Sequence, residues 1–102
     1  QVNGGDGMPQ MDDNHKQREL CVLLAQIQDP DDIFAFLSDL CTAKEMENMA
    51  ERCYAAKLLI AGNTYNQVMA QANISSATLS RVSRCVQYGK GYSRVLKLKT
   101  EE

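Results

Sequence analysis

The sequence predicts an all-α protein with a single domain. Apolar residues recur at steps of three and four along most of the chain, which is the spacing of one face of a helix. With only two Pro and six Gly, the chain is too poor in turn residues for an all-β fold. Its 102 residues suit one domain with a modest core, which Leu, Ile, Val, Met and Ala must fill because Trp is absent.

The N-terminal segment is expected to be a disordered arm. Residues 1–12 are rich in Gly and polar residues and have no apolar period. Met8 and Met11 are both candidate starts of the natural chain. The folded domain is therefore expected to span residues 13–92.

The first helix is predicted at about residues 13–28. Its apolar stripe is wider than one small bundle needs to cover, because Cys21 and Val22 extend it beyond the residues at regular helical spacing. That width indicates a dimer in which this helix packs against a second chain. The stripe itself follows the helical spacing at Leu20, Leu23, Leu24 and Ile27.

The next two helices begin at clear capping signals. Asp29 can cap the second helix, whose first residue is Pro30 and whose first turn is acidic. Thr42 followed by Glu45 forms a capping box for a long central helix. Gly62 supplies a left-handed stop at the end of that helix.

Two shorter helices are expected in the second half of the chain. The fourth should span about residues 64–72, and the fifth residues 76–88 with Ser75 as its N-cap. Gly89 marks the end of the fifth helix. Residues 93–102 form a basic stretch that is either a tail or a last short helix.

The charge is unevenly divided along the chain. The net charge is −2, but eleven of the thirteen acidic residues precede Arg52 and eight of the eleven Lys and Arg lie from Arg52 onward. Between Arg52 and Thr100 there is no carboxylate side chain, so a polyanion approaching that half meets only attraction. The alternative is that the two halves neutralise each other across a dimer.

Several classes of protein and site are not expected. No apolar run is long enough for a transmembrane helix, and no leader peptide is visible, so a cytoplasmic protein is expected. The cysteines are too widely spaced for a zinc site and are expected to be reduced thiols that pack as small core hydrophobes. No catalytic pair surrounds the single histidine, His15, so the chain is not expected to be an enzyme. The four cysteines are Cys21, Cys41, Cys53 and Cys85.

Residues 65–82 have the pattern of a helix-turn-helix. Two short helices that meet at a sharp angle need apolar residues at their junction, and the turn needs a residue that tolerates positive φ. Asn73 lies at that turn, and its backbone is expected to adopt the left-handed conformation with positive φ. The residues expected to face inward are Val68, Met69, Ile74, Leu79 and Val82.

The outward face of the second helix in this motif is expected to contact DNA. Small polar residues let a helix enter the major groove, Arg can bind a guanine edge or a phosphate, and the helix N-terminus presents free amides to phosphate. An ordinary solvated face is the alternative. The predicted DNA-binding residues are Asn66, Gln67, Ser75, Ser76, Ala77, Thr78, Ser80, Arg81 and Arg84.

Three segments in order resemble the Trp repressor superfamily, in particular its YerC/YecD-type members. They are residues 40–52 (LCTAKEMENMAER), 58–62 (LLIAG) and 74–89 (ISSATLSRVSRCVQYG). The resemblance covers about residues 13–92. It implies a Trp-repressor-like helical bundle, an intertwined homodimer with interlaced N-terminal helices, and an operator-binding segment at about residues 64–88.

The resemblance also implies a pocket for a small effector. Trp repressor has a glycine where this chain has Val82 and a serine where it has Cys85. Val82 would occupy space beside the indole ring, and a thiol is a poorer acceptor for an ammonium group, which argues against tryptophan. A different small ligand, or none, is expected, with no other cofactor. The matching effector-binding positions are Thr42, Arg52, Thr78, Arg81 and Cys85.

The function expected from these observations is that of a sequence-specific DNA-binding transcriptional regulator. It should bind double-stranded operator DNA as a homodimer, and the resemblance implies repression as the direction of control. The alternative is a helical protein-interaction module that has kept the fold and lost DNA binding.

Overall fold

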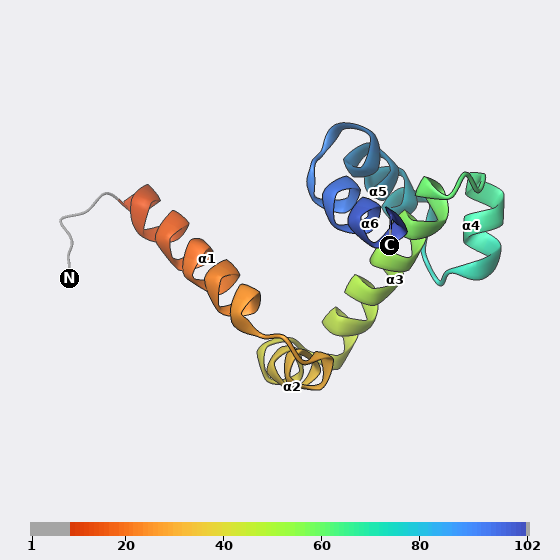
Figure 1. Ribbon diagram of the computed structural model, residues 1–102. Coiled ribbons are helices and arrows are strands. Elements are labelled where there is room, and N and C mark those ends of the chain that lie inside the picture. Colours follow the sequence, from red (N-terminus) through yellow and green to blue (C-terminus); the bar gives the residue numbers. More distant parts are fainter. Residues whose placement is uncertain (1–8, 102) are drawn as a thin grey trace. The chain divides into compact units, whose positions relative to one another are not determined.

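The computed structural model describes the backbone of residues 9–101 and the side-chain surroundings of residues 14–97. Within residues 9–101 it contains six α-helices and no strand (Figure 1). The chain divides into two units, Gln1–Leu40 and Cys41–Glu102, which are described separately. The predicted all-α fold class is confirmed.

The N-terminal unit contains α1 (Pro9–Gln26) and α2 (Pro30–Leu40). α1 begins before the predicted residue 13, so part of the segment assigned to the arm is helical, with Pro at the first position where a missing N–H is harmless. Residues 1–8 of that arm lie outside the described residues. α1 also ends earlier than predicted, and Ile27 follows the helix.

α2 begins where the sequence predicted. The Asp29 side chain accepts a hydrogen bond from the Asp31 backbone N–H at 3.1 Å, which satisfies one of the free amides of the first turn. Asp31 and Asp32 place negative charge at the positive end of the helix dipole. These local signals fix the start of the helix without any tertiary contact.

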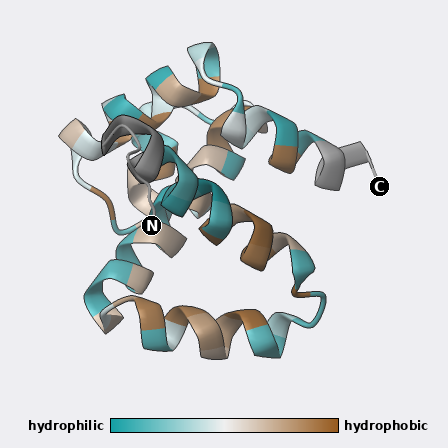
Figure 2. Ribbon diagram, turned by 90° about the vertical axis from the view of Figure 1, so that its left-hand side faces the viewer, coloured by the Kyte–Doolittle hydropathy of each residue, from teal (hydrophilic) through white to brown (hydrophobic). Residues whose placement is uncertain are grey.

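The N-terminal unit exposes much of its apolar surface. No residue of α2 is buried, and Phe34 is 63% exposed. Leu23 on α1 is 50% exposed. Figure 2 shows brown, hydrophobic residues along the second half of α1 and along α2. Two helices of this size cannot bury their own apolar faces, which is typical of a surface that needs a partner.

The C-terminal unit begins with α3 (Ala43–Ile60), and its predicted ends are confirmed. The Glu45 N–H donates to Thr42 Oγ1 at 3.0 Å, and the Thr42 N–H donates to Glu45 Oε1 at 2.8 Å, which completes the capping box. Gly62 has φ of +101°, so the chain leaves α3 through the left-handed conformation that glycine tolerates best.

α4 (Tyr65–Gln71) and α5 (Ser76–Tyr88) follow within two residues of the predicted bounds. The Ser75 hydroxyl caps α5 by accepting from the Thr78 N–H at 3.2 Å. α4 has a second capping box, between Thr64 and Gln67, that sequence reasoning missed. Its T-x-x-Q pattern was the signal that could have revealed it.

The basic C-terminal stretch forms α6 (Gly91–Glu101), so the short-helix alternative holds. Leu96 is buried, and the Ser93 hydroxyl donates to the Val86 carbonyl of α5 at 3.0 Å. That carbonyl lies in the last turn of α5, where no intrahelical donor remains. α6 is thus an integral part of the C-terminal unit.

The core of the C-terminal unit consists of two clusters, and each contains residues of α3 and α5. Ile74 and Leu59 pack against both clusters, so the loop between α4 and α5 is tied to α3. The first cluster comprises Ala55, Val68, Ala72 and Leu79, and the second Ala56, Val82 and Leu96.

The cysteines are free thiols, but none is buried, and Cys21 and Cys53 are exposed, so they are not core residues of this chain. None of the described helices is both long enough and apolar enough to cross a lipid bilayer.

Candidate nucleic-acid interface

The inward side of the helix-turn-helix holds α4 and α5 on the long helix α3. Val68 and Leu79 are fully buried and Val82 nearly so, as predicted. Met69 is the exception: it is 41% exposed, and Ala72 takes the buried position of α4. One turn separates Val68 from Ala72, so these two residues share the face that packs on Ala55, whereas Met69 points to the side.

The turn between α4 and α5 does not use a left-handed residue. No described non-glycine residue has positive φ, so the prediction for Asn73 is wrong. The chain leaves α4 through extended backbone at Ala72, with φ of −114° and ψ of 145°, and therefore reverses without αL geometry. The Ile74 N–H donates back to the Ala72 carbonyl at 3.1 Å and closes the turn.

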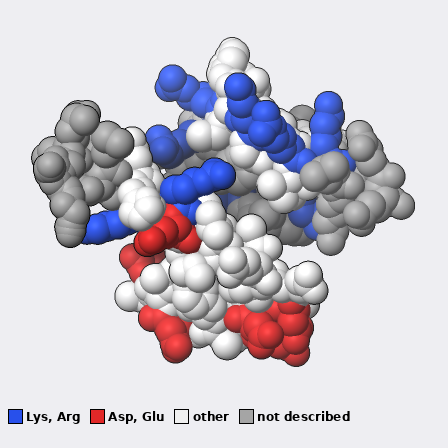
Figure 3. All heavy atoms as spheres, turned by 60° about the vertical axis from the view of Figure 1, so that its left-hand side comes forward, with Lys and Arg blue, Asp and Glu red and all other residues white. Residues whose placement is uncertain are grey.

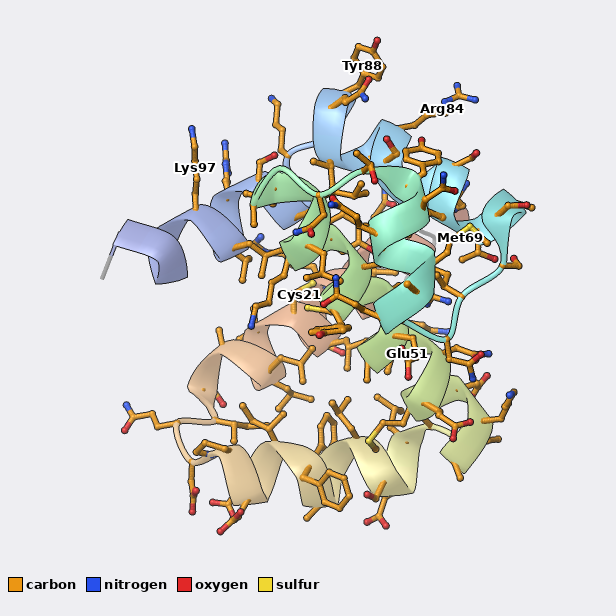
Figure 4. All side chains as sticks on the ribbon, turned by 90° about the vertical axis from the view of Figure 1, so that its right-hand side faces the viewer. Cys21, Glu51, Met69, Arg84, Tyr88 and Lys97 are labelled. Atoms are coloured by element: carbon orange, nitrogen blue, oxygen red, sulfur yellow. The ribbon has the colours of Figure 1, made fainter. Side chains whose placement is uncertain are left out.

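A carboxylate from α3 holds the same turn. Glu51 Oε1 accepts a hydrogen bond from the Asn73 N–H at 3.0 Å, across 22 residues of sequence. Glu51 also lines a small polar pocket of about 220 Å³ beside the N-terminus of α5, with Asn48, Arg52 and Thr78 among its other walls. Figure 4 marks Glu51 on α3. Sequence reasoning missed this contact because no local pattern links the two positions.

The outward side of α5 presents most of the residues predicted to bind DNA. Thr78 is half-buried. Its hydroxyl lies 3.0 Å from the Ser75 hydroxyl, which keeps both side chains at the start of the helix. The exposed residues of the set on α5 and its cap are Ser75, Ser76, Ala77, Ser80, Arg81 and Arg84.

The α4 residues of the predicted interface are also at the surface. Asn66 and Gln67 are both exposed. The Gln67 side-chain oxygen accepts the Thr64 N–H at 2.8 Å, which leaves its amide nitrogen available to donate to another molecule. Gln67 is therefore suited to donate to an acceptor such as a phosphate oxygen.

The charges around α5 favour an anionic partner. Among the side chains that the structure describes, the ion pairs are His15–Glu19 and Lys44–Glu47, and neither involves an Arg or Lys of α5 or α6. In Figure 3 the blue Lys and Arg atoms at the top of the view have no red Asp or Glu atoms among them. In Figure 4, Arg84 and Tyr88 project away from the body of the unit. These cations are free to neutralise phosphates.

Four of the five predicted effector positions meet around one cavity. Arg52 from α3 and Thr78, Arg81 and Cys85 from α5 line a space of about 330 Å³, together with Val82 and Tyr92. Thr42 is not among these lining residues, and its hydroxyl is engaged in the capping box of α3. Tyr92 comes from α6, which sequence reasoning left as a possible tail.

Comparison with known proteins gives a consistent result. The model of the Trp repressor protein family matches residues 15–100. YerC of Bacillus subtilis, described as uncharacterized, is 38% identical over 66 residues, which cover 65% of this chain and 64% of YerC. The chain therefore spans less than two thirds of that relative.

Solved structures agree with the match to the family model. A Trp repressor candidate from Staphylococcus aureus has a TM-score of 0.80 and 29% identity over 86% of this chain and 89% of its own. A TrpR-like protein from Eubacterium eligens has a TM-score of 0.76 and 32% identity over 81% of this chain and 87% of its own. Because the family model matches residues 15–100, which are most of the chain, this chain belongs to the Trp repressor family.

Proposed function

We propose that this protein is a DNA-binding transcriptional regulator that reads operator DNA through α5 and works as a homodimer. The observation that carries the proposal is the two-sided character of α5. Leu79 and Val82 fasten it to α3, while Ser76, Ser80 and Arg81 stay exposed. The Trp repressor family is one of regulators and not of enzymes, which supports the same conclusion.

The chemistry of the exposed face fits the major groove. Serine hydroxyls are short enough to let the helix approach base edges, and the capped N-terminus of α5 points amides at phosphate. Arg81 and Arg84 can each bind a guanine edge through two hydrogen bonds or hold a phosphate. The interface therefore combines sequence readout with charge.

The dimer is supported by the exposed apolar face of the N-terminal unit. A single chain leaves Leu23, Phe34 and Leu40 at least half exposed, and a second copy would remove that surface from water. In a dimer that binds a two-fold operator, the two copies of α5 lie about 34 Å apart, one turn of B-DNA. Repression is the proposed direction of control.

Duplex selection followed by titration tests the proposal. Duplexes of about 40 base pairs with a randomised centre are enriched on the wild-type protein, and the selected sequence is labelled for anisotropy titration across a salt series. We expect Arg81→Ala and Arg84→Ala to weaken binding by about 1–3 kcal/mol each if the lost contact is to a base. Lys57→Ala, which removes an exposed charge from α3, is the matched control.

Two outcomes would contradict the proposal. Wild-type affinity in both arginine variants would show that α5 is not the DNA-binding helix. No binding of any duplex even at low salt would favour the alternative of a protein-interaction module. Lys57→Ala should change affinity much less than either arginine variant, which separates local contacts from net charge.

A small effector is proposed for the cavity between α3, α5 and α6. Its volume lies within the range of ligand pockets, and the guanidinium groups of Arg52 and Arg81 favour a carboxylate-bearing molecule. Val82 and Cys85 make tryptophan a poor fit. Thermal-shift measurement with a panel of amino acids and small carboxylates, on wild type and Arg52→Ala, tests this proposal. A stabilisation by any panel member that Arg52→Ala retains would place the ligand elsewhere.

A further inference from the structure

Three exposed basic residues lie on α6 or directly before it, and they are called here the α6 basic stripe: Lys90, Arg94 and Lys97. Arg94 and Lys97 are three residues apart and therefore share one side of the helix. Lys90 immediately precedes α6, and its carbonyl accepts the Arg94 N–H at 3.1 Å in the first helical hydrogen bond. The opposite side faces the core through Tyr92, which is half-buried, and Leu96, which is buried. The stripe is thus presented outward by a helix whose other face is fixed.

α6 is held at a defined position relative to α5. The Ser93 hydroxyl binds the Val86 carbonyl, and Leu96 packs with Val82 in one cluster. The connection at Gly89 is also tight, since a Cβ there would lie 2.7 Å from the Cys85 carbonyl oxygen. The distance from the α6 basic stripe to α5 is therefore set by packing and by a short connection.

Lys97, the last residue of the stripe, projects toward the same side of the unit as the end of α5. In Figure 4, Lys97 on α6 projects toward the top of the view, as do Tyr88 and Arg84 on α5. Tyr88 is 82% exposed and leaves its phenol free to donate a hydrogen bond. No Lys or Arg of the stripe forms an ion pair among the described side chains.

We propose that the α6 basic stripe is a second DNA-contacting surface, which binds the phosphate backbone beside the site that α5 reads. The inference rests on the proposed function. From Lys90 to Lys97 the stripe extends about 10 Å at 1.5 Å per helical residue. One DNA strand carries a phosphate every 3.4 Å or so along the axis, so a stripe of this length can reach neighbouring phosphates of one strand. It adds affinity and lengthens the footprint without reading sequence.

A salt series with charge-removing variants tests the α6 basic stripe. The double variant Arg94→Gln/Lys97→Gln removes two charges and keeps residues of high helix propensity, and circular dichroism checks that it folds. Each lost phosphate contact reduces the magnitude of the slope of log affinity against log salt by about 0.9. The affinity gained on lowering the salt from 1 M to 0.1 M is then smaller by about eightfold per contact. We expect the double variant to lose about two contacts, and its hydroxyl-radical footprint to shorten at the flanks.

Controls separate this inference from the proposed function. Lys57→Gln, which removes an exposed charge from α3, should leave the slope and the footprint unchanged. The double variant should keep the wild-type order of preference among operator variants, because phosphate contacts carry no sequence information. Arg81→Ala, by contrast, should alter that order.

Two results would overturn the inference, and they are distinct. If wild type binds the selected duplex and the double variant matches it in salt slope and footprint, the stripe is a solvated face and only the inference fails. If wild type binds no duplex at low salt, the proposed function and the inference fail together.

Discussion

Gly62 is the position at which the backbone conformation most requires glycine. Its φ of +101° follows the end of α3, and an added Cβ would meet no atom within 4 Å, so the cost of a side chain lies in the backbone alone. We expect Gly62→Ala to lower the free energy of unfolding by about 1–2 kcal/mol. Urea denaturation followed by circular dichroism measures the change.

Gly91 provides the matched control for Gly62. A Cβ at Gly91 also meets open space, its φ lies outside the left-handed range, and it begins α6. Gly91→Ala should therefore leave stability unchanged or raise it slightly, because alanine has the higher helix propensity. Equal destabilisation by both substitutions would show that the left-handed backbone at Gly62 is not the cause.

At the same scale, single positions show where sequence patterns fall short. Leu79 and Val82 were predicted to be buried and are buried. Met69 was assigned inward, but Ala72 occupies that place, because a small residue lets α4 approach Ala55 of α3 closely. A pattern of apolar residues cannot decide between Met and Ala when both lie near the same helix face.

Among the elements, the contact between α3 and the turn before α5 has a measurable role. Glu51 accepts the Asn73 N–H, so Glu51→Ala should leave that amide without its protein partner. We expect a loss of about 0.5–1.5 kcal/mol in stability and faster hydrogen exchange at Asn73. Glu51→Gln keeps a side-chain oxygen and should retain most of the protection. Unchanged exchange in Glu51→Ala would contradict this role.

The elements themselves were largely predictable because their ends are set by local chemistry. The capping box at Thr42, the Asp29 cap of α2 and the Ser75 cap of α5 each require only residues within one turn. The start of α1 was missed because residues 9–12 carry no apolar period. α6 was left open because its packing on Val82 and Ala56 is a contact between distant parts of the chain.

For the whole molecule, the exposed apolar face of the N-terminal unit leads to a prediction about assembly. Phe34→Glu places a charge in that face and should weaken a dimer by about 2 kcal/mol or more if Phe34 is a central contact. Sedimentation-velocity experiments over a concentration series measure the monomer fraction. Gln28→Glu adds the same charge at an exposed polar position and should remain dimeric. A wild-type protein that sediments as a monomer would refute the proposed dimer.

Local sequence patterns were enough to predict the second to fifth helices, most of their caps, and which helix carries the exposed arginines. Those features depend on neighbours along the chain and on helical spacing, which one sequence displays. The link from Glu51 to Asn73 and the cavity that gathers Arg52, Arg81 and Tyr92 became evident only once the helices were packed in three dimensions. Each of these joins residues far apart in sequence, and their meeting depends on how α4, α5 and α6 pack on α3.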